Sequence, residues 1–127
     1  MSAGVIAIDH VQVTVPAERM ADAQHFYGRT LGLAEIPQPA REQPEPGAWY
    51  RVGAAELHLR AEAGTGESRR HVAFAVADLD QAAAALAAAG AEPLPDRRPV
   101  AGVRRIFVRD PGGNRVELVE RPPAGGR

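Results

Sequence analysis

Hydrophobic and polar residues alternate in several short stretches of the chain, and this alternation predicts half-buried strands. In residues 5–15, Val11, Val13 and Val15 share one face, while His10 lies on the other. Each such strand would bury one row of side chains and leave the other row accessible. The same pattern predicts further strands at residues 49–52, 55–60, 71–76, 105–109 and 115–120.

Two segments have the periodicity of helices that cover one face of a sheet. Residues 18–31 carry apolar side chains, among them Met20 and Tyr27, at helical spacing. Residues 79–89 are rich in alanine, and Asp78 before them is a good N-cap. A glycine follows each segment and is expected to end the helix.

The order of strand, helix and further strands occurs twice, and the two copies match in sequence. The stretch HVQVTV from His10 matches HVAFAV from His71, and Leu-His-Leu around His58 matches Val-Glu-Leu around Glu117. Nearly the same number of residues separates the members of each pair. The chain is therefore predicted to form one domain over residues 1–127, with modules at 5–60 and 71–121, a linker at 61–70 and a disordered tail at 122–127.

The composition excludes several kinds of chemistry. The 127 residues include no Cys and no Lys, so disulfides, thiolate nucleophiles and Lys Schiff bases are excluded. The formal charge of -1 gives no reason to expect nucleic acid or an anionic membrane as a partner. No long apolar stretch or signal peptide is visible, and we expect a cytoplasmic protein.

Three of the four histidines and one glutamate occupy the matched points of the two modules. Strand alternation places His10, His58, His71 and Glu117 opposite the apolar residues that would pack beneath a helix. Imidazole and carboxylate together suit a divalent ion such as Zn, Ni, Co, Fe or Mn. A shift in register would bring Glu56 to the site instead of His58, and the match between the modules favours His58.

Five stretches carry a resemblance to a known family: DHV from Asp9, FYGRTLGL from Phe26, ELHL from Glu56, HVAF from His71 and DPGGNRVE from Asp110. Together they resemble the vicinal oxygen chelate superfamily, which includes glyoxalases, epimerases, fosfomycin-resistance enzymes, extradiol dioxygenases and bleomycin-resistance proteins. The resemblance implies an α+β fold in which two βαβββ modules form a curved mixed sheet around a concave metal or ligand site. It also implies helices on the outer face and a homodimer.

The resemblance also implies roles for particular residues. His10, His71 and Glu117 match the ligands common to most metal-binding members. Position 58 matches a fourth ligand position, where Glu or Gln is usual, so His58 departs from the pattern of glyoxalase I. Glu117 remains one candidate for the base that removes a proton from the substrate.

The sequence therefore predicts a divalent-metal-dependent enzyme of the glyoxalase type that chelates a small oxygenated substrate. Isomerase or lyase chemistry through an enolate-like or oxyanionic intermediate is favoured. We expect Trp49, Tyr50 and Arg105 to contact the substrate. One alternative is a metal-free protein that binds a drug or metabolite, as bleomycin-resistance proteins do. Others are an extradiol-type dioxygenase and a thiol transferase. Whether the metal site lies within one chain or across a dimer is open.

Overall fold

The computed structural model describes residues 1–2, 4–40, 45–64 and 68–122. Most of the predicted tail at 122–127, and residues 65–67 of the predicted linker, lie outside the described residues.

The first half of the chain forms a four-stranded sheet in the order β1-β4-β3-β2. β1 pairs with β4 in parallel, and the other pairs are antiparallel. Three short helical segments connect β1 to β2. The elements are β1 (His10–Val15), η1 (Ala17–Arg19), α1 (Met20–His25), η2 (Phe26–Thr30), β2 (Ala34–Ile36), β3 (Gly47–Val52) and β4 (Ala55–Ala61).

The second half repeats this plan in a three-stranded sheet of order β5-β7-β6. β5 pairs with β7 in parallel, and β6 pairs with β7 antiparallel. A single bridge between Leu94 and Phe107 lies where the first half has β2. The elements are β5 (His71–Val76), α2 (Leu79–Ala88), β6 (Arg105–Arg109) and β7 (Arg115–Glu120).

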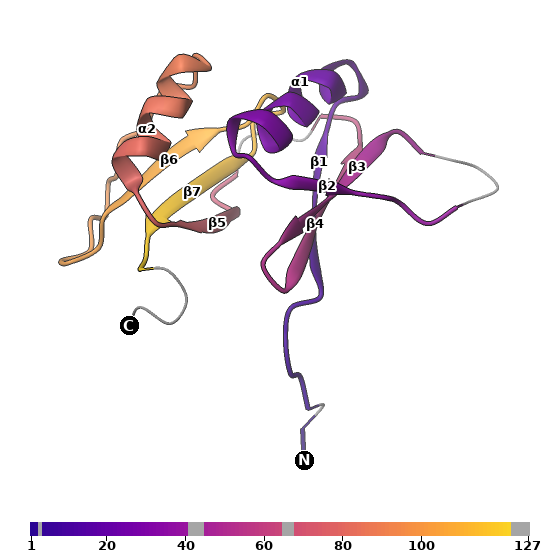
Figure 1. The fold of residues 1–127 in the computed structure, drawn as a ribbon, viewed down its shortest axis with the longest axis horizontal. Coiled ribbons are helices and arrows are strands. Elements are labelled where there is room, and N and C mark those ends of the chain that lie inside the picture. The colour runs from indigo at the N-terminus through magenta and orange to yellow at the C-terminus, as the bar shows by residue number, and fades with distance from the viewer. Residues whose placement is uncertain (3, 41–44, 65–67, 123–127) are drawn as a thin grey trace.

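This architecture confirms the predicted fold class, an α+β fold of two βαβββ modules. Figure 1 shows α1 and α2 on the same side of the two sheets, so the helices cover one face and leave the other open. The covered face holds the core, in which Leu57, Leu59, Val116 and Leu118 are at most 2% exposed. Asp78 caps α2 as predicted, because its carboxylate accepts a hydrogen bond from the backbone N–H of Gln81.

The two sheets meet at the turn between β6 and β7, in which residues 110–114 read DPGGN. The phenol of Tyr27 donates a 2.6 Å hydrogen bond to Asp110 Oδ2, and Asp110 Oδ1 accepts from the backbone N–H groups of Gly112 and Asn114. Asn114 Nδ2 donates to the carbonyl oxygen of Thr14 in β1 at 2.8 Å. A polar network therefore connects the helix of the first module, its first strand and the last turn of the second module.

The structure corrects several predicted boundaries. Residues 5–9 do not belong to a strand; β1 begins at His10, and Val5 and Ile6 are exposed. The predicted helix over 18–31 is divided, because its last segment widens to i→i−5 bonding, with the Leu31 N–H donating to the Phe26 carbonyl. The short strand β2 was not predicted, since its three residues carry too little periodicity.

Candidate metal centre

The strand register gives the two halves of the site the same geometry. Gln12 is the Cα partner of His58 across the β1–β4 ladder, and Ala73 is the partner of Glu117 across the β5–β7 ladder. In each module, the second candidate ligand therefore lies opposite the residue that comes two positions after the histidine at the start of the parallel strand. His58 and Glu117 occupy equivalent positions, as the match between the halves predicts.

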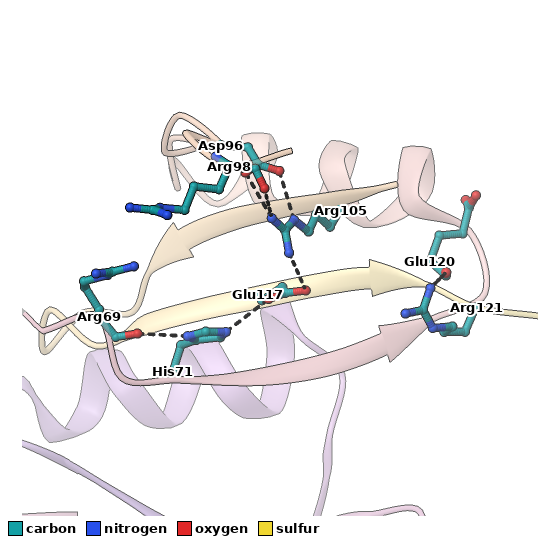
Figure 2. Close-up of polar contacts among 8 residues, drawn as sticks. All are labelled: Arg69, His71, Asp96, Arg98, Arg105, Glu117, Glu120 and Arg121. Atoms are coloured by element: carbon teal, nitrogen blue, oxygen red, sulfur yellow. Dashed lines mark hydrogen bonds and ion pairs between the residues drawn. The ribbon is translucent and has the colours of Figure 1, made fainter. Parts of the chain in front are cut away.

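In the second module, the imidazole of His71 faces the carboxylate of Glu117. Its Nε2 lies 3.1 Å from Glu117 Oε1, and its Nδ1 lies 2.9 Å from the carbonyl oxygen of Arg69. Figure 2 shows this chain of contacts along the accessible side of β5 and β7. The carbonyl can only accept, so Nδ1 carries a proton. In the neutral imidazole, Nε2 then presents a lone pair to the carboxylate.

Two lone pairs facing each other at this distance attract only when a cation lies between them. That cation is either the second proton of an imidazolium or a metal ion. A histidine that ligates metal through one nitrogen generally donates the N–H of its other nitrogen to a carbonyl or a carboxylate. The contact between His71 and Arg69 has that form. The pair His71 and Glu117 therefore fits half of a metal site.

In the first module, each of the two histidines contacts a carboxylate. His10 Nδ1 lies 2.7 Å from Asp9 Oδ1, and His58 Nε2 lies 2.9 Å from Glu56 Oε1. The first contact leaves His10 Nε2 available to a metal, and the second leaves His58 Nδ1 available. The two imidazole rings stack with a centroid distance of 4.1 Å. His10 and His58 thus form the second histidine pair.

Glu56 and His58 are not alternatives. They are two residues apart in β4, so both side chains lie on the same face of the strand. His58 is buried at 5% exposure. Glu56 also lies 3.6 Å from the guanidinium of Arg51, which balances part of its charge. The structure places Glu56 behind His58 as its carboxylate partner.

The three predicted substrate-binding residues lie in different surroundings. Trp49 stacks on His58 with ring centroids 3.8 Å apart, on the accessible face. Tyr50 lies on the opposite face of β3 in the core and contacts α1 through its hydroxyl, 3.4 Å from the Gln24 carbonyl. Neighbouring residues of a strand point to opposite faces, so Trp49 and Tyr50 cannot both line the site.

Arg105, the third predicted substrate contact, lies on the site face but is already paired. Its guanidinium makes two hydrogen bonds to Asp96, at 2.9 and 3.1 Å, and lies 3.9 Å from Glu117 Oε2 (Figure 2). The hydrogen bond from Arg105 is the main cause that lowers the pKa of Asp96 from its ordinary value. Arg105 therefore positions the loop of Asp96 beside the site.

The four predicted ligands form two pairs on two sheets. Within the described parts of the chain, no three His, Asp or Glu side chains lie close enough together to hold one ion. A cavity of about 470 Å³ lies over His10, Trp49 and His58. A second cavity, of about 440 Å³, lies between β1 and β5 and reaches His71 and Arg115. Each pair thus borders its own cavity.

Two polar residues of the site face are not among the predicted site residues. Arg60, two residues beyond His58, is 8% exposed and donates to Gln38 Oε1 at 2.7 Å. Arg115 is the Cα partner of His71 and lies over the ring of Phe107 at 4.1 Å. Both positions follow from strand alternation, because each is two residues from a candidate ligand. That spacing was the signal available in the sequence.

The fold and the paired histidine and carboxylate side chains define a class of small proteins built from duplicated βαβββ modules with a ligand site on the open face. The family model described as the Glyoxalase/Bleomycin resistance protein/Dioxygenase superfamily matches residues 7–118. The chain belongs to this superfamily. The comparison with curated proteins found no match.

Solved structures share the fold over nearly the whole chain. A putative glyoxalase family protein from Bacillus anthracis is 36% identical, with a TM-score of 0.82 over 95% of this chain and 99% of that one. A mutant of the fosfomycin resistance protein FosX from Listeria monocytogenes, in complex with Mn(II) and dihydroxypropylphosphonic acid, is 18% identical, with a TM-score of 0.77 and coverage of 98% and 96%. Lactoylglutathione lyase from Agrobacterium tumefaciens is 20% identical, with a TM-score of 0.69 and coverage of 92% and 95%.

Among the described residues, no helix is both long enough and apolar enough to cross a membrane.

Proposed function

We propose that this protein is a divalent-metal-dependent enzyme of the glyoxalase type, with His10, His58, His71 and Glu117 as metal ligands. The contact between His71 Nε2 and Glu117 carries the proposal, because a divalent ion would satisfy both groups while His71 Nδ1 donates to the Arg69 carbonyl. The Mn(II) in the FosX complex makes manganese one of the ions to test, beside Zn, Ni, Co and Fe.

A bound divalent ion would supply Lewis acidity, polarising a substrate oxygen so that an adjacent C–H becomes acidic. A side chain of the protein would then accept the proton from that carbon. Glu117 has one oxygen, Oε1, directed at His71 and the other, Oε2, on the side of Arg105. A carboxylate with two separate partners can keep one contact while its other oxygen takes a proton from carbon. Isomerase or lyase chemistry on a small oxygenated substrate follows.

We further propose that the complete site forms between two copies of the chain, in a homodimer. The pair His10 and His58 of one copy would face the pair His71 and Glu117 of the other. The charges of the two faces support this pairing. Asp9 and Glu56 lie behind the first pair, while Arg115, the strand partner of His71, lies beside the second. Faces of opposite charge attract and fix the orientation of two partners.

Elemental analysis of protein purified without a His tag tests the metal proposal. Wild type should hold about one Mn, Fe, Co, Ni or Zn per site, and His71→Ala and Glu117→Ala should lose it. His25→Ala is the matched control, because His25 lies exposed on α1 away from both pairs, and its metal content should equal that of wild type. A wild type that stays empty after reconstitution with each ion would overturn the proposal.

Complementation tests the shared site. A His10→Ala/His58→Ala variant is mixed with a His71→Ala/Glu117→Ala variant, after unfolding and refolding together. If sites form between chains, each mixed dimer has one intact site and the mixture regains metal. If each site lies within one chain, no combination restores a site, and the mixture remains empty.

A metal-free binding protein is the second candidate. The stacked rings of His10, His58 and Trp49 favour it, since they form a column of near-parallel rings beside a cavity of about 470 Å³, and a planar ligand could extend that stack. Quenching of the fluorescence of Trp49, the only tryptophan, reports binding there. Saturable quenching by planar compounds in protein that takes up no metal would favour this second function.

A further inference from the structure

Arg115 is a half-buried cation with no carboxylate within salt-bridge distance among the described residues. It makes no hydrogen bond or salt bridge to any described residue, and its Nε is buried with no partner atom. Its contact in the structure is the ring of Phe107, over which the guanidinium lies at 4.1 Å. Buried donors in folded proteins are nearly always paired, because an unpaired one gives up its bonds to water without replacement. Because Arg115 lines a cavity, an external acceptor would reach the other N–H groups of its guanidinium from that side.

The position of Arg115 brings that acceptor close to the second ligand pair. Arg115 is the Cα partner of His71 in the β5–β7 ladder and precedes Glu117 by two residues on the same face. Phe107 packs edge-on against His71, with a centroid distance of 5.8 Å. One aromatic ring thus supports both the arginine and the histidine. A group bound by Arg115 would lie beside His71.

The adjacent cavity favours an anion. Arg115 lines the space of about 440 Å³ between β1 and β5, together with Arg70 and the hydroxyl-bearing Ser68. Among the described lining residues, Glu62 is the one carboxylate, and it accepts a hydrogen bond from Thr14. Arg105, the other arginine over Phe107, differs from Arg115 because its charge is neutralised by Asp96. Among the described residues, Arg115 and Arg70 are the arginines of this cavity that form no ion pair with a carboxylate.

We propose that Arg115 binds an oxyanion of the substrate, a carboxylate or a phosphoryl group, and holds it beside the ligand pair of His71 and Glu117. A guanidinium held over an aromatic ring still presents its planar N–H fork, which suits two oxygens of such a group. The substrate would then carry an anionic group next to the oxygens that the metal binds. This inference rests on the proposed function for its place in catalysis, but the anion site itself requires no metal.

Proton–nitrogen NMR of the Arg115 Nε–H group tests the inference directly. The signal is identified by its loss in Arg115→Gln. At low ionic strength, inorganic phosphate and acetate are titrated separately into metal-free and metal-loaded wild type. A saturable shift of this signal with either anion supports the site, and the anion that binds more tightly tells a phosphoryl from a carboxylate ligand. Arg115→Gln should weaken binding roughly 10- to 100-fold, measured on the backbone amide of His71.

Arg29→Gln, which removes an exposed charge from η2, should bind the anion as wild type does. Arg115→Lys keeps the charge and loses the fork, and it should fall between wild type and Arg115→Gln. The inference is overturned if neither anion shifts the Arg115 signal, or if Arg115→Gln binds like wild type. It is also overturned if the signal shifts with protein concentration alone, because a second copy would then supply the acceptor.

Metal content separates this inference from the proposed function. Arg115→Gln should hold as much metal as wild type, because Arg115 is not a ligand. Loss of anion binding with metal retained supports both ideas. Anion binding in a protein that takes up no metal upholds the anion site and contradicts the metalloenzyme.

Discussion

Replacement of Tyr27 by Phe tests the network that joins the two modules. The change removes only the hydroxyl, whose 2.6 Å bond to Asp110 is buried, since Tyr27 is 1% and Asp110 4% exposed. A hydrogen bond to a charged acceptor contributes about 1.5–3 kcal/mol. Asp110 Oδ2 keeps its 2.9 Å bond from Asn114 Nδ2, so we expect a loss of about 2 kcal/mol in the free energy of unfolding.

The expected loss corresponds to a decrease in Tm of about 7 °C for a chain of this length. Urea unfolding followed by circular dichroism measures the free energy, and calorimetry measures Tm. Tyr50→Phe is the matched control. Tyr50 is equally buried, but its hydroxyl lies 3.4 Å from a neutral carbonyl, so its loss should be below about 1 kcal/mol. Equal losses in the two variants would refute the argument that Asp110 makes the difference.

The pH dependence gives an independent test of the same contact. Burial first, and the neighbouring Asp110 second, raise the pKa of Tyr27 well above its ordinary value near 10. The folded state therefore holds the phenol proton more tightly than the unfolded chain does. The resulting stability is complete below about pH 10 and decreases as pH rises further. Because Tyr27→Phe lacks this group, the difference in stability between wild type and variant should narrow above about pH 10.

Three further predictions follow from individual contacts. Gly112→Ala should destabilise the fold by about 1–3 kcal/mol in urea unfolding, because the new Cβ would lie 2.5 Å from Val15 Cγ1 and 3.1 Å from its Cα; a neutral result would mean that the turn can move freely. Asp78→Ala should lower the free energy of unfolding by about 1 kcal/mol, because it removes the N-cap of α2. Asp78→Asn can still accept the capping hydrogen bond and should retain most of that free energy in the same urea experiment. Arg105→Gln should raise the pKa of Asp96 toward its ordinary value, as seen by NMR titration of its carboxyl carbon, and an unchanged pKa would contradict the pairing of Arg105 with Asp96.

Local patterns sufficed to predict much of this fold. Strand alternation gave β6 and β7 their observed bounds, and the cap at Asp78 gave α2 its observed start. The match between the two modules predicted equivalent places for His58 and Glu117, which the register of the two parallel ladders now provides. These features follow from residues within one strand or helix turn of each other.

Features that depend on distant contacts could not be predicted in this way. The face of the sheet to which Tyr50 points depends on the register of β3. A shift of one residue in that register would turn every side chain of the strand to the other face. The widened turn of η2 is not encoded by any single residue in it. Whether Arg115 Nε has a hydrogen-bond partner depends on side chains from other elements of the fold. Sequence periodicity describes only the neighbours in the same strand, so it could not predict that this partner is missing among the described residues.

For a chain that binds metal as proposed, the turn at residues 110–114 has a consequence for metal selectivity. Among the described strands, no ladder joins the two sheets; the junction is made by a shared apolar core and by side-chain bonds such as that from Asn114 to Thr14. A substitution in this turn would alter the angle between the sheets without replacing any of the four proposed ligand residues. Divalent ions differ in the bond lengths and ligand numbers they require. Selection for a different ion could therefore act on the turn, at positions that touch neither metal nor substrate.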